Sequence, residues 1–299
     1  CNKSMVSGFP FKKINEEQTN FSNQEFLEKI NIALDHCFKG DVFQVVLSRK
    51  FEQAFQGDEF NVYRTLRSIN PSSYLFYFDY GNFKIFGSSP EAQLVIQDNK
   101  AQINPIAGTF RRSGNVETDK LIAKALAIDP KENAEHVMLV DLARNDLSKS
   151  CTNVKVEEFK KIEFYSHVIH LVSKVSGQLA DDHNTIKVLG ETYPAGTLSG
   201  APKHEAMKII DQNEPNSRGF YGGTLGYIGL NGDINHAIFI RSFVSQNNVL
   251  RYQAGCGIVI KSIPDEELKE IDNKLFALRK AIDSAEQMHL ATTDKQITN

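Results

Sequence analysis

The chain has 299 residues, of which 41% are hydrophobic and 24% are charged, so it can bury a substantial core in one large domain or in two closely packed subdomains. Its net charge is −3 and no segment concentrates Lys and Arg, which excludes the basic footprint that nucleic-acid binding needs. No apolar run approaches the length of a membrane span, and the four scattered cysteines lack metal-ligand spacing and suit a reducing compartment. We therefore expect a cytoplasmic protein with no membrane or nucleic-acid partner.

The N-terminal segment is polar and irregular. The chain begins with Cys rather than Met, so residues 1–22 are expected to be a linker or the remnant of a missing N-terminal part. Ser22 has the side chain of a helix cap, and apolar residues recur after it at helical spacing until Gly40. Segments 42–51 and 59–69 then predict a strand and a helix.

Two hairpins are predicted in the next part of the chain. Residues 73–89 contain two aromatic-rich, alternating runs around a short turn. A second pair of alternating runs is joined across Asp98 and Asn99. Both patterns are typical of antiparallel strands that bury one face.

A helix start is predicted where a capping acid, Asp129, precedes Pro130. This helix is expected to end near Leu147, and strands are expected to return over 154–164 and 168–179.

The C-terminal part combines glycine-punctuated strands with one long helix. Residues 221–259 are expected to form β structure with a hairpin turn at Asn231 and Gly232. A last helix is expected from Pro264, and residues 285–299 are expected to be a frayed polar tail. Long antiparallel strands with helices between groups of strands indicate an α+β fold.

Two pairs of glutamates share one spacing. Glu132 and Glu135 lie three residues apart on one predicted helix, and Glu267 and Glu270 lie three apart on the last helix, with Lys274 one turn on. Residues three apart share a helix face, so each pair projects its carboxylates together. A solvated acidic face is one interpretation, and a Mg²⁺ site held by carboxylates, waters and substrate oxygens is the other.

Four glycine-rich segments, 105–109, 193–203, 218–223 and 254–259, combine glycine with hydroxyl or cationic residues. Exposed backbone N–H groups in such turns can bind anions, although each glycine alone is equally typical of a turn or bulge. None of the segments is a Walker A motif or a dinucleotide fingerprint. Arg241, in an alternating run, is either an edge cation or a fork for a carboxylate.

Two further residues are weak signals by themselves. His170 lies in an alternating strand, where a histidine is often structural, and Glu91 follows Ser89 and Pro90 at a strand start. From residues alone, the prediction stops at an anionic, Mg-assisted small-molecule site.

Taken together, nine segments in order over residues 23–284 resemble the chorismate-utilising enzymes, a family of anthranilate, aminodeoxychorismate, isochorismate and salicylate synthases. The segments are GSSPE, PIAGTFRR, DPKENAEHVMLVDLARNDL, YSHVIHLVS, YPAGTLSGAPK, RGFYGGTLGYIG, IRS, AGCGIV and EELKEIDNK. The resemblance implies a catalytic domain over 23–284, built as two large, mostly antiparallel sheets packed as a sandwich with helices outside. It also implies that an N-terminal subdomain is missing.

The resemblance assigns a metal site. It implies that Glu135 and Glu270 bind Mg²⁺ and that Glu132 and Glu267 bind it through water or orient the site. The metal would neutralise the ring carboxylate of chorismate and act as a Lewis acid.

The resemblance also assigns substrate contacts. Tyr221 and Arg241 match a clamp on the enolpyruvyl carboxylate. Glu91 matches the general acid for the departing C4 hydroxyl, with His170 and Thr197 near it. The pocket for the ring carboxylate would be completed by Gly108, Thr109, Gly255, Gly257 and Lys274.

Two positions favour anthranilate synthase within the family. Gln44 occupies the position that matches the lysine that activates water in isochorismate and salicylate synthases. An amide has no basic lone pair, so activation of water is not expected there. Ala107 replaces the lysine that resembles a covalent nucleophile in aminodeoxychorismate synthases.

The implied ammonia source is a glutamine amidotransferase partner, anthranilate synthase component II, and a homo-oligomer stays open. The alternatives are an aminodeoxychorismate synthase of folate synthesis and a non-catalytic fragment that binds the amidotransferase.

Overall fold

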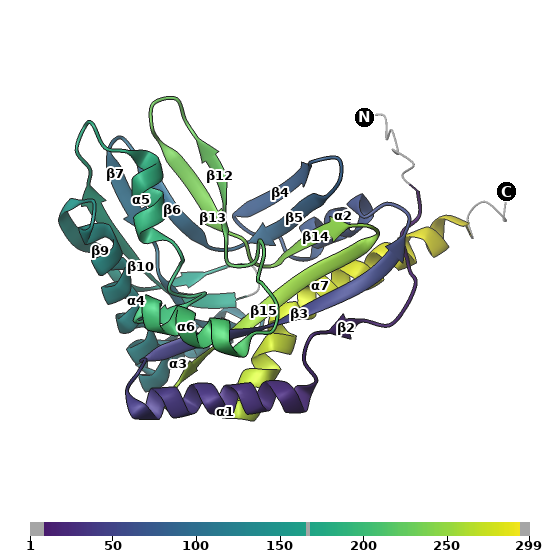
Figure 1. The fold of residues 1–299 in the computed structure, drawn as a ribbon, viewed down its shortest axis with the longest axis horizontal. Coiled ribbons are helices and arrows are strands. Elements are labelled where there is room, and N and C mark those ends of the chain that lie inside the picture. Colours follow the sequence, from purple (N-terminus) through teal and green to yellow (C-terminus); the bar gives the residue numbers. More distant parts are fainter. Residues whose placement is uncertain (1–8, 166–167, 294–299) are drawn as a thin grey trace. The chain divides into compact units, whose positions relative to one another are not determined.

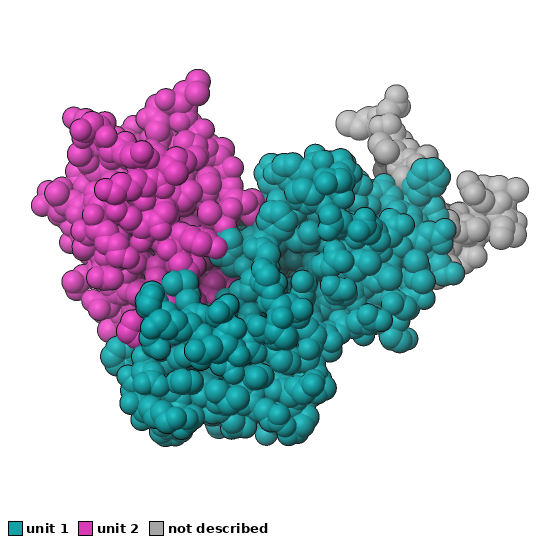
Figure 2. Space-filling view, in the orientation of Figure 1, with its two compact units in different colours: residues 1–90, 204–223, 239–299 teal, residues 91–203, 224–238 magenta. Residues whose placement is uncertain are grey.

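The protein is represented by a computed structural model that describes residues 9–165 and 168–293. Its strands and helices divide into two compact units, which Figure 2 distinguishes by colour. Unit 1 comprises residues 1–90, 204–223 and 239–299, and unit 2 comprises residues 91–203 and 224–238. Each unit contains one antiparallel sheet with its own helices, so the expected α+β class with two sheets is confirmed.

The sheet of unit 1 has the strand order β1-β3-β15-β14-β5-β4, with β2 also paired to β3 (Figure 1). Its longest pairing joins β3 to β15, from Gln44 opposite Val259 to Ala54 opposite Val249. The strands are β1 (Lys12–Lys13), β2 (Gln18–Thr19), β3 (Gln44–Gln56), β4 (Tyr74–Asp79), β5 (Lys84–Ser89), β14 (Ser242–Gln246) and β15 (Val249–Val259).

Helices cover this sheet and complete its core. They are α1 (Asn23–Lys39), α2 (Phe60–Ile69), α6 (Lys203–Asn213) and α7 (Pro264–Thr293). Phe26 of α1, Leu66 of α2 and Leu275 of α7 are fully buried in one cluster. The predicted cap of α1 is confirmed, because Ser22 and Glu25 form a capping box and Gly40 ends the helix with φ 80°.

The two ends of unit 1 differ from the expectation. Residues 9–22 are not an irregular linker, because β1 and β2 pair with β3 and the rings of Phe11 and Phe21 are buried. The C-terminal helix does not fray near residue 285, because α7 continues to Thr293 and Ala285 is still in the core. In both places apolar contacts that are distant in sequence override the polar local composition.

The sheet of unit 2 has the strand order β12-β13-β6-β7-β10-β8, and β9 pairs with the other side of β10. The predicted turn at Asp98 and Asn99 is confirmed, since both residues have positive φ between β6 and β7. The strands of this sheet are β6 (Ala92–Gln97), β7 (Lys100–Ile103), β8 (Ile106–Arg111), β9 (Thr152–Phe164), β10 (Val168–Gln178), β12 (Thr224–Ile228) and β13 (Ile234–Ile238). The short strand β11 (Gly200–Ala201) is not part of this sheet.

Three helices belong to unit 2: α3 (Val116–Ile128), α4 (Pro130–Ser148) and α5 (Thr185–Thr192). Asp129 caps α4 through the backbone N–H groups of Lys131 and Glu132, as the sequence predicts. Val140 and Leu147 of α4 pack against the strands of the sheet.

None of the helices in the described ranges combines the length and the apolar character needed to cross a bilayer. Cys37, Cys151 and Cys256 are free thiols, and Cys1 lies outside the described residues.

His136 on α4 is fully buried, and its Nε2 lies 2.6 Å from Oγ of Ser173. Burial, with a smaller contribution from the charge of Lys160, lowers the pKa of His136 from 6.5 to about 4. The unfolded chain binds this proton near pH 6.5 but the folded chain binds it only near pH 4. The contribution of neutral His136 to the free energy of unfolding is therefore complete above pH 6.5. It decreases as the pH falls from 6.5 to about 4.

We expect His136 to lower the free energy of unfolding by up to about 3 kcal/mol between pH 6.5 and pH 4, since one pKa unit corresponds to about 1.4 kcal/mol. Urea unfolding in EDTA at several pH values should give a flatter stability curve for His136→Gln than for the wild type. The partly exposed His183 supplies the control, and His183→Gln should keep the wild-type slope. Equal slopes in all three proteins would contradict this assignment.

Candidate functional site

The residues predicted to bind substrate in unit 1 form one cluster around Lys274. The Nζ of Lys274 donates a hydrogen bond of 2.7 Å to the carbonyl of Gly255 and forms an ion pair with Glu270 one turn earlier on α7. The Nη1 of Arg241 donates to the backbone carbonyl of Lys274. We call Tyr221, Arg241, Gly255, Glu270 and Lys274 the unit 1 cluster.

Tyr221 is held against this cluster by its neighbours. A Cβ at position 255 would lie 3.0 Å from the Tyr221 hydroxyl, so the glycine lets the phenol approach the backbone of β15. Burial raises the pKa of Tyr221, which therefore keeps its proton and can donate a hydrogen bond. The guanidinium of Arg218 lies over the Tyr221 ring at 5.8 Å, and Glu214 holds Arg218 with hydrogen bonds of 2.6 and 2.8 Å.

Arg241 differs from its predicted environment. The expected continuous strand ends with β13 at Ile238 and resumes with β14 at Ser242, and Arg241 lies between them with φ 53°. An arginine in the left-handed region is held there by its surroundings. Burial lowers the pKa of Arg241, and the nearby Tyr221 and Glu270 oppose this effect. A guanidinium stays charged in proteins, so the residue presents a desolvated cation.

The glutamate pair on α7 lies beside the buried stripe of that helix, as the spacing predicts. Glu267 is only 2% exposed, and Ile271 and Leu275 are fully buried. Burial, with the charges of Glu267 and Glu270 among smaller effects, raises the pKa of the Cys256 thiol. Glu267 is therefore enclosed at the edge of the core, whereas 43% of the Glu270 side chain is exposed.

Gln44 lies in β3 beside the glycine-rich end of β15. Its side chain is 2% exposed, and a Cβ at position 257 would lie 2.8 Å from its Nε2. Gly257 is therefore required for the amide to occupy this place. The Oε1 of Gln44 is buried and receives no hydrogen bond from the described residues.

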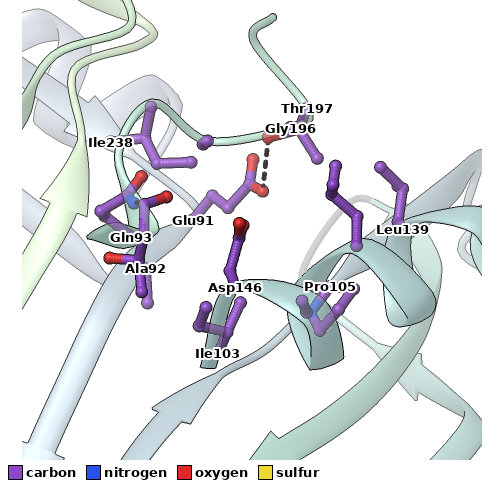
Figure 3. Close-up of a pocket in the computed structure, with 14 residues that line it drawn as sticks. Glu91, Ala92, Gln93, Ile103, Pro105, Leu139, Asp146, Gly196, Thr197 and Ile238 are labelled. Carbon is purple, nitrogen blue, oxygen red and sulfur yellow. Dashed lines mark hydrogen bonds between the residues drawn. The ribbon is translucent and has the colours of Figure 1, made fainter. Parts of the chain in front are cut away.

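In unit 2, Glu91 and Thr197 lie together in a pocket (Figure 3). The Thr197 hydroxyl donates a hydrogen bond of 2.9 Å to Oε1 of Glu91, and the backbone carbonyl of Glu91 accepts from Ile238 N at 3.0 Å. The pocket is also lined by Asp146 of α4 and Gln93 of β6. The predicted general acid and its predicted hydroxyl neighbour are thus in direct contact.

Gly108, Glu132 and His170 form a second group in unit 2. Gly108 has φ 66°, and a Cβ there would lie 3.1 Å from Oε2 of Glu132 and 2.6 Å from Leu126. The Nδ1 of His170 lies 2.9 Å from the carbonyl of Gly108, which can only accept, so Nδ1 carries the ring proton. The backbone of Thr109 pairs with His170, and its side chain lies outside what the structure describes.

The four glutamates fit a hard divalent cation by their chemistry. Glu132 and Glu135 lie in the first turns of α4, and Glu267 and Glu270 lie in the first turns of α7. Carboxylate oxygens are among the donors that Mg²⁺ prefers. Glu132 and Glu135 belong to unit 2, and Glu267 and Glu270 belong to unit 1. Over residues 9–165 and 168–293, no three His, Cys, Asp or Glu side chains are grouped so that they could hold a metal ion.

Sequence reasoning did not single out several charged residues that support the predicted ones. Lys203 forms an ion pair of 2.5 Å with Asp146 in the pocket wall, and Glu214 holds Arg218 under Tyr221. Lys203 lies inside the segment 193–203, whereas Glu214 and Arg218 follow the end of α6 at Asn213, where the chain is not helical. The spacing rule for helices therefore does not apply to the second pair, and both pairs depend on the folded structure.

Comparisons with known proteins give the family. Residues 3–280 match the chorismate binding enzyme family. Anthranilate synthase component 1 from Aquifex aeolicus is 45% identical over 272 residues, which cover 90% of this chain and 55% of that protein. The protein of the same name from Bacillus subtilis is 42% identical over 279 residues, which cover 93% of this chain and 54% of that protein. The chain thus spans about half the length of these curated relatives.

Solved structures agree with this assignment. Anthranilate synthase component I from Streptococcus pneumoniae is similar with a TM-score of 0.81 at 38% identity, over 91% of this chain and 60% of that one. The menaquinone-specific isochorismate synthase from Escherichia coli is similar with a TM-score of 0.84 at 25% identity, over 93% of this chain and 64% of that one. The chain therefore belongs to the chorismate binding enzyme family.

Proposed function

We propose that this chain is the catalytic part of an anthranilate synthase component 1, which converts chorismate and ammonia to anthranilate and pyruvate. Relatives with this name at 45% and 42% identity support the proposal. The observation that carries it is that neither Gln44 nor Ala107 is a lysine, at the two positions where a lysine would change the reaction.

Gln44 argues against water as the nucleophile. A buried amide has no basic lone pair at neutral pH and cannot take a proton from water. At a pH above the pKa of the ammonium ion, ammonia carries a free lone pair and needs no such base. The site is therefore suited to an amine nucleophile rather than to formation of isochorismate.

Ala107 argues against a covalent intermediate on the enzyme. It is buried in β8 with 6% of its surface exposed, and its methyl group has no nucleophilic atom. Ammonia would then add directly to C2 of chorismate as the C4 hydroxyl leaves as water, and elimination of pyruvate would make the ring aromatic. An aminodeoxychorismate synthase would have to work without its lysine.

The unit 1 cluster supplies the groups that would bind carboxylates. Arg241 is half-buried and anchored by the carbonyl of Lys274, so its remaining N–H donors would form a fork for the enolpyruvyl carboxylate. Tyr221, which keeps its proton, would donate to the same carboxylate. Lys274 and the backbone at Gly255 would contact the ring carboxylate.

Glu91 would act as the general acid at the C4 oxygen. The Thr197 hydroxyl donates to Oε1, which orients the carboxyl group for proton transfer. The contact of His170 Nδ1 with the carbonyl of Gly108 orients the imidazole ring. These residues would position the leaving group before it is protonated.

Mg²⁺ is proposed as the cofactor, with Glu135 and Glu270 as direct ligands and Glu132 and Glu267 bound through water or orienting the site. When bound, the ion would offset the charge of the ring carboxylate and polarise it. The ion pair between Glu270 and Lys274 would loosen to free the carboxylate for this role.

We further propose a glutamine amidotransferase subunit as the source of ammonia, in the cytoplasm and at the first step of tryptophan biosynthesis. The relatives are called component 1, which supports a second component. With free ammonium salt the partner is not required, so the reaction can be tested on this chain alone.

The test is product formation by the purified 299-residue chain with chorismate, ammonium chloride and Mg²⁺ at pH 8 to 9. We expect anthranilate, detected by its fluorescence and by chromatography, and we expect EDTA to abolish it. Formation of 4-amino-4-deoxychorismate would instead identify an aminodeoxychorismate synthase. A folded protein that gives no turnover at saturating ammonium and Mg²⁺ would identify a non-catalytic fragment.

A further inference from the structure

A small pocket in unit 2 lies behind the carboxyl group of Glu91. Its volume of about 40 Å³ is too small for a chorismate-sized ligand but offers room for about two or three water molecules. Glu91 and Asp146 are the titratable residues in its lining, and Figure 3 shows their carboxyl ends directed toward the same space. Most of the remaining wall is apolar.

Gln93 is one of the residues that line this pocket. Its side chain is 3% exposed, and its Nε2 donates a hydrogen bond of 3.2 Å to the carbonyl of Thr192. This bond fixes the orientation of the amide, because a flipped amide would place oxygen against oxygen. The Oε1 of Gln93 is then buried without a donor among the described residues. A buried amide oxygen that accepts no hydrogen bond is energetically costly, so we expect a donor molecule beside it.

Asp146 is the second acceptor. Its side chain is 5% exposed, and it forms ion pairs with Lys203 at 2.5 Å and with Lys149 at 3.1 Å. Each carboxylate oxygen accepts from one ammonium group and still has a lone pair to offer. Lys203 also donates to the carbonyl of Thr192 at 2.9 Å, so one carbonyl joins the Gln93 amide to the Asp146 ion pair.

We propose that this pocket holds an ordered water molecule that keeps Glu91 in its acid form, with Gln93 as the positioning residue. A water molecule has two donors, and the acceptors of Gln93 and Asp146 use both. Its lone pairs then face Glu91 and can only accept the carboxyl proton. This inference rests on the proposed role of Glu91 as the general acid.

The matched pair of substitutions Gln93→Met and Gln93→Glu tests the proposal through the pH dependence of kcat. Methionine has a similar length but no acceptor of this kind, so the water can turn a donor toward Glu91. The basic limb of the profile should move to lower pH by about one unit, which lowers kcat at pH 8 about tenfold but restores it on the acid plateau. Glutamate adds a negative charge, so the limb should move to higher pH.

Gln102→Met on the neighbouring strand β7 is the control, because Gln102 bonds to Asn104 and does not line the pocket. Its profile should match that of the wild type. A uniform loss of kcat at every pH in Gln93→Met, or shifts of the same sign in both Gln93 variants, would overturn the proposal and leave a structural role only.

A second measurement does not depend on turnover and so separates this inference from the proposed function. The infrared difference spectrum between the wild type and Glu91→Gln at pH 7 should contain the carbonyl band of a protonated carboxyl group. That band should weaken when the same difference is taken in the Gln93→Met background. An equal band in both backgrounds would refute the role of Gln93, even in a protein that makes no anthranilate.

Discussion

Replacing Glu135 by glutamine is expected to remove Mg-dependent turnover. Glutamine keeps the size of the side chain and one oxygen but loses the charge that binds a hard cation. Even residues outside the direct ligands of a metal typically affect affinity or activity about 10–100-fold, so a direct ligand should cost about a hundredfold or more at saturating Mg²⁺. The measurement is anthranilate formation against Mg²⁺ concentration, together with Mg²⁺ binding by calorimetry.

The other proposed metal-site glutamates supply an internal scale for this effect. Glu132→Gln should have the smaller effect of a residue that acts through water, and Glu270→Gln should match Glu135→Gln. Asp141→Asn is the matched control, because Asp141 lies on the same helix α4, is largely exposed and forms an ion pair of 3.5 Å with Arg144. Turnover by Glu135→Gln within tenfold of the wild type, with the same Mg²⁺ dependence, would remove the metal assignment.

The Glu91→Gln variant is expected to bind chorismate but to lose most of its turnover. The amide can keep the contact with the Thr197 hydroxyl, but it has no proton to give to the leaving C4 oxygen. General acid catalysis contributes about 10²–10⁴-fold, so kcat should fall by that factor while the apparent affinity for chorismate changes little. Steady-state kinetics with ammonium as the second substrate measures both quantities.

The control for this substitution is Glu158→Gln, which removes the same charge from an exposed side chain on β9 that pairs with Lys161. Its kinetics should be those of the wild type. If Glu91→Gln raises KM but keeps kcat, then Glu91 binds substrate rather than protonating it, and the proposed role fails.

Local sequence patterns were sufficient for most element boundaries. The capping box at Ser22, the left-handed Gly40 and the cap at Asp129 depend on side chains within four residues of each other. The turn at Asp98 and Asn99 likewise needs only two residues that tolerate positive φ. Such signals are short-ranged, so they could be predicted correctly from the chain alone.

The candidate site could be predicted as a set of residues but not as a set of contacts. The spacing of Glu267 and Glu270 beside an apolar stripe predicts a shared face at the edge of the core, and the buried Glu267 agrees with it. The contact of Lys274 with the Gly255 carbonyl could not be predicted, because it joins a helix to a strand 19 residues earlier. Nor could the orphaned oxygen of Gln93, which depends on the carbonyl of Thr192.

The sequence by itself determined the α+β class, the helix caps, the tight turns and the family, because each depends on neighbouring residues or on motifs in order. Only the tertiary structure decided that residues 9–22 join the sheet, that the strand breaks before Arg241 and that Asp146 and Gln93 share a pocket with Glu91. The physical reason is that burial and strand pairing between distant segments outweigh the local preference for secondary structure. Phe11, which is buried in the core, is an example.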